Sequence, residues 1–234
     1  MKLMKFFGRG AGFTDRHTSA YFISGNDLVI IDCPSNAFSQ LMKMKLSRYE
    51  NIYVLITHTH GDHIGGLGLF LQFTFWTLRK KIKIVAPNRN IETDIKNLLK
   101  IEGNESEWYE IYTPCAVKES FLIKPIFTEH SPQLKGKCFG YELDVNNTHC
   151  VYTGDTSTLE PFVPLLKEGT VLYVDVSVDY GHVHLKLEDV LEDLIKFSKK
   201  GVQIYLMHLD DEKRAKEIIQ GLENISLAPL INEM

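Results

Sequence analysis

The sequence predicts a mixed α/β fold in which strands and helices form layers, and two observations lead to this expectation. Short apolar runs rich in β-forming residues recur in both halves of the chain, separated by turn signals. Longer segments between and after them carry apolar residues at helical spacing. Strands, then a helix, then strands and helices again fit a layered α/β architecture, and two similar halves packed face to face would account for the repetition.

The first half is expected to begin with a hairpin, because Gly25-Asn26-Asp27 joins two short apolar runs. The fully apolar run at 53–56 is typical of a central strand. The expected strands are 19–23, 28–31, 53–56 and 81–85. Helices are expected at 64–78, from its apolar length, and at 91–101, from a one-sided apolar face.

The second half repeats this organisation, with a turn signal at Asn146-Asn147 and a helical apolar stripe that ends before Gly201. The expected strands are 139–145, 149–153, 171–176 and 203–207. Helices are expected at 187–195 and 211–222. Because no repeat, low-complexity tract or long linker interrupts the sequence, residues 1–234 are expected to form a single domain.

Composition excludes several classes of protein. The 234 residues are 44% hydrophobic and 24% charged, as in ordinary soluble globular proteins. A net charge of −4 argues against binding nucleic acid through bulk positive charge, although a local site could still hold a phosphate. The longest apolar run, 64–78, is too short to span a bilayer, so no membrane partner and a cytoplasmic location are expected. The cysteines form no C-x-x-C pair and are expected to be reduced and mostly buried: Cys33, Cys115, Cys138 and Cys150.

One cluster carries most of the chemical information. The segment after the strand at 53–56 reads Thr57-His58-Thr59-His60-Gly61-Asp62-His63. By composition, such an H-x-H-x-D-H pattern arises by chance in only about one of 1,000 sequences of this kind. Imidazole and carboxylate groups bind zinc and similar ions, and a turn after a strand can aim them at two ions side by side. The alternative is a polar loop that caps a helix.

Two metal ions need more ligands than this segment provides. Three candidates lie where predicted strands end: His130 after 126–129, Asp155 after 150–154, and His208 after 204–207. Loops at strand ends are where α/β proteins commonly assemble their sites. Together with the first cluster, these positions predict that His130, Asp155 and His208 complete the ligand set.

The order of these elements resembles the metallo-β-lactamase superfamily over nearly the whole chain. The resemblance implies a four-layer αββα sandwich with a dinuclear site along one edge. It assigns His58, His60 and His130 to the first metal ion, Asp62, His63 and His208 to the second, and Asp155 to both. The best-known zinc β-lactamases carry a cysteine where Asp155 stands, so antibiotic hydrolysis is disfavoured.

The N-terminal part is similar to the tRNase Z-like phosphodiesterases, in the segments 6–13, 18–20 and 31–33. That branch has a further histidine, which assists the phosphate and the leaving oxygen. His184 fits this position because it directly precedes the amphipathic helix, and His182 is the competing candidate. The tRNA-processing members carry an extra Gly/Pro-rich arm, whereas only 29 positions separate Asp155 from His184 here.

Among compact relatives, the chain most resembles the anti-Pycsar cyclic-nucleotide phosphodiesterases and their bacterial homologues. The matching segments are 56–60, 65–68, 154–156, 183–185 and 207–210. The resemblance implies a homodimer that hydrolyses 3′,5′-cyclic mononucleotides and so counters cyclic-nucleotide antiviral signalling. One departure is Cys33-Pro34, where the family usually has Cys-Gly. The alternatives are a tRNA 3′-end endonuclease, a metal-stabilised binding protein and a carbonyl hydrolase, with no stable nucleic-acid partner expected.

The expected mechanism uses two divalent cations, Zn²⁺ with Mn²⁺ or Fe²⁺ as alternatives, and a bridging hydroxide that attacks phosphorus. Asp62 and His184 are the expected catalytic residues. Asp32 is expected to orient a ligand histidine, with a turn-forming role before Pro34 as the alternative. Aromatic side chains that could stack on a base, although core packing is expected for most, are Phe70, Phe73, Phe75, Trp76, Trp108, Tyr109 and Tyr112.

Overall fold

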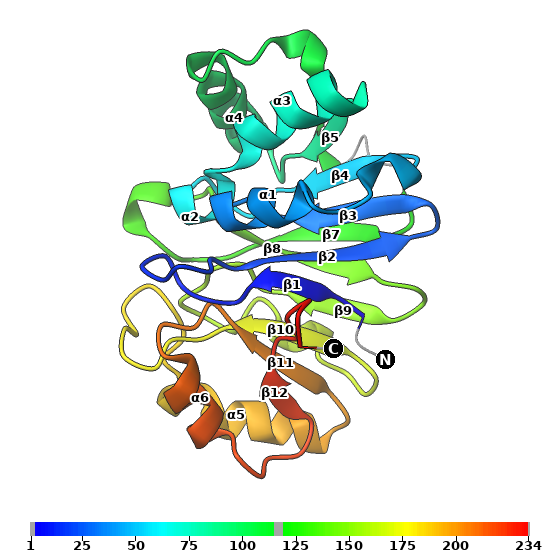
Figure 1. The fold of residues 1–234 in the computed structure, drawn as a ribbon. Coiled ribbons are helices and arrows are strands. Elements are labelled where there is room, and N and C mark those ends of the chain that lie inside the picture. The colour runs from blue at the N-terminus through cyan, green and yellow to red at the C-terminus, as the bar shows by residue number, and fades with distance from the viewer. Residues whose placement is uncertain (1–2, 115–118, 234) are drawn as a thin grey trace.

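The computed structural model describes residues 3–114 and 119–233. Within them, two six-stranded sheets face each other and helices cover their outer faces (Figure 1). The strand order is β1-β2-β3-β4-β5-β6 in one sheet and β12-β11-β10-β9-β8-β7 in the other. The predicted αββα sandwich is therefore confirmed, and each half of the chain builds one sheet.

The N-terminal sheet begins antiparallel and continues parallel from β3 to β6. Its strands are β1 (Lys5–Gly8), β2 (Ser19–Ser24), β3 (Asp27–Ile31), β4 (Ile52–Leu55), β5 (Ile82–Val85) and β6 (Tyr109–Tyr112). The helices of this half are α1 (Ser35–Leu41), α2 (Gly61–Ile64), α3 (Leu67–Leu78) and α4 (Arg89–Ile101), with short turns η1 (Leu46–Arg48) and η2 (Ser106–Trp108).

The C-terminal sheet has the same plan, with antiparallel pairs from β7 to β9 and parallel pairs from β9 to β12. Its strands are β7 (Leu122–Phe127), β8 (Phe139–Asp144), β9 (His149–Tyr152), β10 (Val171–Asp175), β11 (Gln203–Met207) and β12 (Ile225–Leu227). The helices are α5 (Leu187–Lys199) and α6 (Glu212–Ile218), with turns η4 (Pro132–Leu134) and η5 (Val163–Leu165).

One hydrophobic core lies between the two sheets, where aromatic side chains from both halves meet. The ring of Phe6 lies 5.5 Å from that of Tyr173 and 6.4 Å from that of Tyr152, and all three side chains are fully buried. Burying a large apolar side chain contributes roughly 1.5–3 kcal/mol. This packing holds the two halves together, so loops at one edge of both sheets can share a site.

The apolar segment 64–78 differs from its prediction as one helix, because α2 and α3 are separate. The break lies at Gly65 and Gly66, where the Gly66 N–H donates to Cys33 O at 2.9 Å. A Cβ at Gly66 would lie only 2.6 Å from Pro34 O, so the start of α3 packs directly on the turn after β3. The closing helix is also shorter than the predicted 211–222, because the chain turns at Gly221 (φ +81°) into β12.

The described cysteines agree with the prediction of buried, reduced thiols. Cys33, Cys138 and Cys150 are free and buried, and Cys115 lies outside the described residues. None of the helices in the described part of the chain is long and apolar enough to cross a membrane.

Candidate metal centre

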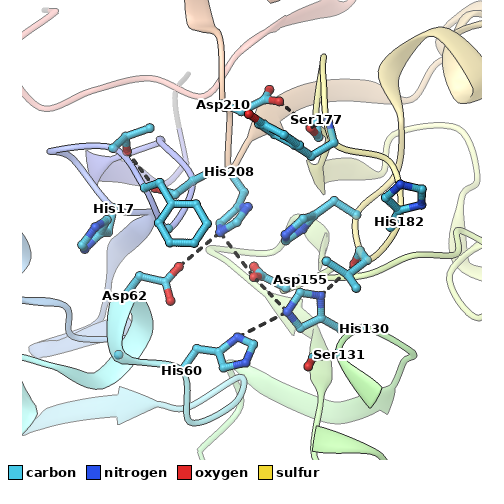
Figure 2. A pocket seen from close by; sticks show the side chains of 18 residues that line it. His17, His60, Asp62, His130, Ser131, Asp155, Ser177, His182, His208 and Asp210 are labelled. Atoms are coloured by element: carbon cyan, nitrogen blue, oxygen red, sulfur yellow. Dashed lines mark hydrogen bonds and ion pairs between the residues drawn. The ribbon is translucent and has the colours of Figure 1, made fainter. Parts of the chain in front are cut away.

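All seven predicted ligands lie together at one edge of the sandwich, at the ends of strands. Figure 2 shows five of them, His60, Asp62, His130, Asp155 and His208, converging from different elements. The segment from His58 to His63 follows β4, and His130 follows β7. Asp155 and His208 follow the parallel strands β9 and β11. The carboxyl ends of parallel strands meet at the same edge of a sheet, which explains why residues so distant in sequence converge.

The side chains form two groups whose ligand atoms lie within 4.8 Å of one another. The first group is His58, His60, His130 and Asp155, and the second is Asp62, His63, Asp155 and His208. Asp155 Oδ2 lies between the groups: its distances to Nε2 of His58, His130, His63 and His208 are 3.7, 3.7, 3.2 and 3.3 Å. One carboxylate is therefore placed to serve two adjacent cations.

In the first group, hydrogen bonds fix which imidazole nitrogen faces the centre. The Thr57 hydroxyl donates to Asp32 and so accepts from His58 Nδ1, at 3.0 Å. His130 Nδ1 donates to Val183 O at 2.7 Å. Both rings thus keep Nε2 as the free acceptor, whereas His60 turns Nδ1 toward them, 3.0 Å from His58 Nε2 and 3.3 Å from His130 Nε2. Three lone pairs converge, which is the donor set that a divalent transition metal takes.

In the second group, His63 Nδ1 donates to Asp32 Oδ2 at 2.8 Å, and its Nε2 is buried without a hydrogen-bond partner. Asp62 Oδ2 lies 3.4 Å from both His63 Nε2 and His208 Nε2. A buried lone pair without a partner is costly unless an ion or proton fills the gap. The residues present therefore fit a metal ion in this group as well as in the first.

The electrostatics of the centre also favour a cationic occupant. Burial alone would raise the pKa of Asp155, yet the surrounding histidines, His208 first, hold that pKa well below its usual range. Burial alone would lower the pKa of His208, but the nearby carboxylates, Asp155 first, raise that pKa to about 10. Burial lowers the pKa of His58 and of His60, so these two rings are neutral at physiological pH, the form in which imidazole can bind a metal ion.

Asp32 holds the N-terminal part of the centre, as expected. It is fully buried, adopts φ +59° directly after β3, and accepts the Thr57 N–H at 2.8 Å besides the His63 bond. Aspartate tolerates this left-handed conformation better than most residues. The turn is fixed further by Cys33 N–H, which donates to His63 O at 2.7 Å, so Pro34 does not prevent the arrangement.

Asp175 is a further residue of the candidate site, and the sequence analysis did not single it out. This last residue of β10 is fully buried, and its Oδ2 accepts His184 Nδ1 at 2.8 Å. Its Oδ1 lies 3.4 Å from His208 Nδ1. The His184 ring lies 4.6 Å from the His208 ring, while His182 is exposed on the same loop. The geometry therefore favours His184 over His182 as the additional histidine.

The centre opens into a cavity of about 790 Å³, a size typical of small-molecule sites. Two aromatic side chains absent from the predicted set, Phe13 and Tyr180, line it beside the candidate ligands. None of the seven predicted aromatics, all among the described residues, lines this cavity. Phe70 and Tyr109 are buried in the core, and Trp76 packs edge-on against Trp108 at 5.5 Å.

Comparisons with known proteins agree with this geometry. The family model described as anti-Pycsar protein Apyc1 matches residues 1–228. Anti-Pycsar protein Apyc1 of Paenibacillus sp. (strain J14) is 28% identical over 228 residues, covering 89% of each chain. Ribonuclease Z of Methanocaldococcus jannaschii is 34% identical over 142 residues, which cover 56% of this chain and 44% of that enzyme. The crystal structure of YhfI from Bacillus subtilis, a metallo-β-lactamase fold protein, superposes with a TM-score of 0.76 at 18% identity, covering 97% of this chain and 95% of that one.

Proposed function

The chain belongs to the anti-Pycsar protein Apyc1 family, and from this premise we propose that it hydrolyses 3′,5′-cyclic mononucleotides to nucleoside monophosphates. Family and fold make it a metal-dependent hydrolase of the phosphodiesterase-like kind. The observation that carries the proposal is the pair of donor groups joined by Asp155, members of which line a cavity large enough for a small-molecule substrate. The substrate class comes from the family and is the part that the experiment below tests.

The proposed ligand assignment follows the two groups. His58, His60 and His130 would hold one cation, Asp62, His63 and His208 the second, and Asp155 both. Imidazole and carboxylate donors suit Zn²⁺, with Mn²⁺ or Fe²⁺ as alternatives. When bound, such a pair of cations lowers the pKa of water toward neutrality and offsets the negative charge of the phosphodiester.

Asp62 and His184 have separate tasks in this proposal. Asp62 orients and charges the second group, and its Oδ2 lies within 3.4 Å of two of that group's histidines. His184 donates Nδ1–H to Asp175, so Nε2 is the nitrogen left to face the cavity that the ring lines. There it can hydrogen-bond the phosphate or give a proton to the departing ribose oxygen, a step that breaks the P–O bond without leaving an alkoxide.

A second candidate function is cleavage of RNA 3′ ends, because the 34% identical relative is a ribonuclease Z. The match spans less than half of that enzyme, and the net charge of −4 gives no general attraction to RNA. We therefore rank this activity second. The homodimer and the single domain implied at the start stay predictions, which sedimentation and limited proteolysis would test.

The test is incubation of the metal-loaded protein with a panel of 3′,5′-cyclic mononucleotides beside a precursor tRNA. The expected product is the linear monophosphate, lost with EDTA and in the Asp62→Ala variant. An inactive cyclic panel would refute the proposed substrate class. Cleavage of the precursor tRNA alone would support the second candidate, and inactivity on both would direct the search to carbonyl substrates or to a binding role.

A further inference from the structure

We propose that Phe13 and Tyr180 form an aromatic clamp that stacks on the base of a nucleotide whose phosphate lies at the metal centre. The inference deepens the proposed function and rests on it for the position of the phosphate. Phe13 is fully exposed, at 107% of its reference area, and Tyr180 is 67% exposed, yet both line the cavity that contains Asp62, Asp155 and His208. Large aromatic side chains left in water beside a site are typical of residues that pack on a ligand.

The loop that carries Phe13 is fixed beside a candidate metal ligand. A Cβ at Gly12 would lie 2.9 Å from Asp62 Oδ2, so the backbone just before Phe13 rests on that carboxylate. The Ala11 N–H donates to Leu209 O at 2.9 Å, and the Thr14 N–H donates to Ala11 O at 3.0 Å. The exposure of Phe13 therefore belongs to a tight, hydrogen-bonded turn.

The loop that carries Tyr180 is fixed in a similar way by Asp210. The Asp210 carboxylate accepts Ser177 Oγ at 2.6 Å and the N–H groups of Val178 and Asp179 at 2.7 and 2.8 Å. The Tyr180 N–H donates in turn to Ser177 Oγ at 2.8 Å. The phenol ring thus projects from an anchored backbone.

Both anchors lead to the same short turn. Leu209 and Asp210 directly follow His208, one of the candidate ligands, so the turn that holds a ligand also holds both aromatic loops. Phe13 and Tyr180 come from opposite halves of the sandwich, and both line the cavity. Their loops are held by the same turn, at Leu209 and Asp210. This arrangement anchors the backbones of both aromatic residues beside the proposed phosphate site.

The neighbouring polar groups explain why the occupant should be a planar ring. The Thr14 hydroxyl donates to Ala11 O at 2.8 Å, and the Ser177 hydroxyl is committed to Asp210. These two hydroxyls are engaged in holding the loops, so the rings of Phe13 and Tyr180 remain available to a ligand, in a cavity that His17, Ser131 and His182 also line. A heteroaromatic base is the part of a nucleotide that stacks on such faces, and each stack is worth about 5- to 150-fold in affinity.

Binding of the reaction product to the metal-loaded protein tests the clamp without relying on turnover. AMP and ribose 5-phosphate share the sugar and phosphate and differ in the base, so their dissociation constants isolate its contribution. We expect AMP to bind roughly 10-fold or more tightly than ribose 5-phosphate. Phe13→Ala and Tyr180→Ala should each remove a large part of this difference while leaving ribose 5-phosphate binding unchanged. Tyr180→Phe should retain it.

The control is Trp76→Ala, which removes another exposed aromatic side chain (54%) that lies on α3 outside the cavity. It should alter neither dissociation constant. Equal affinity for AMP and ribose 5-phosphate, no AMP binding, or the same loss for both ligands in Phe13→Ala would overturn the clamp. Base-dependent binding without hydrolysis of any cyclic nucleotide would keep the clamp and refute the proposed substrate class instead.

Discussion

Asp32 and Asp175 occupy corresponding positions in the two halves of the sandwich. Asp32 directly follows β3 and Asp175 ends β10, and each of these strands is third from the edge formed by β1 or β12. Each carboxylate is fully buried and accepts a threonine N–H from the neighbouring strand end at 2.8 Å, from Thr57 in one half and Thr156 in the other. In each half, a buried aspartate fixed by a threonine N–H accepts a hydrogen bond from a histidine of the site, His63 in one half and His184 in the other.

The difference lies in what each carboxylate serves. The Asp32 carboxylate accepts a hydrogen bond from one candidate ligand, His63. It also accepts the N–H and the hydroxyl of Thr57. Asp175 contacts both the candidate ligand His208 and His184, which is outside the two proposed metal groups. Burial raises the pKa of Asp32, whereas the charge of His184 lowers the pKa of Asp175 despite equal burial. The N-terminal half is built to fix ligands, and the C-terminal half links a ligand to the proposed proton donor.

The largest expected effect comes from Asp155, where the two halves meet. Asp155→Asn keeps the shape of the side chain but removes the charge that both donor groups share. We expect turnover to fall below detection and the bound metal to fall below two ions per chain, because each proposed site loses an anionic ligand. Metal analysis of the purified variant, beside turnover, measures this. Full metal content with substantial activity would show that Asp155 does not bridge.

The next largest effect is expected at His184, where a substitution should change kcat without changing metal content. His184→Ala should lower kcat by about 10²- to 10⁴-fold, the usual contribution of a positioned acid or base, with metal content unchanged. His182→Ala is the matched control, since it removes an exposed histidine of the same loop that also lines the cavity but belongs to none of the donor groups of the described residues. It should leave kcat near the wild-type value. Loss of metal in the His184 variant, or a comparable loss of kcat in the His182 variant, would contradict the assignment.

The proposed difference between the two carboxylates is tested by comparing the Asp32→Asn and Asp175→Asn variants. Changing the partner of a ligand histidine typically costs about 10- to 100-fold in metal affinity or activity. Asp32→Asn should weaken metal binding, with kcat recovered when metal is in excess. Asp175→Asn should lower kcat even at saturating metal, because it also releases His184. Titration of each variant with metal, followed by turnover, distinguishes the two, and identical behaviour would refute the proposed division of tasks.

The sequence predicted which residues would cluster at this edge because the candidate ligands carry strong local signals. Three histidines and an aspartate stand in one segment, and His130, Asp155 and His208 each follow an apolar strand. The parallel sheets then bring these strand ends to one edge, so the fold class and the ligand set support each other.

The missed features depend on contacts between distant segments. Asp175 ends a strand as any polar residue could, and only the folded chain brings it to His208. Phe13 lines the cavity because the backbone two residues earlier, at Ala11, is hydrogen-bonded to Leu209. The break between α2 and α3 likewise reflects the contact of Gly66 with Pro34, which local helix propensity does not encode.

The smallest expected effect concerns Thr57 and Thr156, whose N–H groups donate to Asp32 and Asp175. The Thr57 hydroxyl donates to Asp32 and accepts from His58, whereas the Thr156 hydroxyl donates to Thr158 O and makes no bond to Asp175. Thr57→Val should therefore weaken metal binding by roughly 10-fold, the low end for an outer partner. Thr156→Val, an equally buried change of the same shape, should leave metal affinity unchanged and lower only the melting temperature. Equal losses of metal affinity in the two variants would show that the buried hydroxyls support packing in both halves alike.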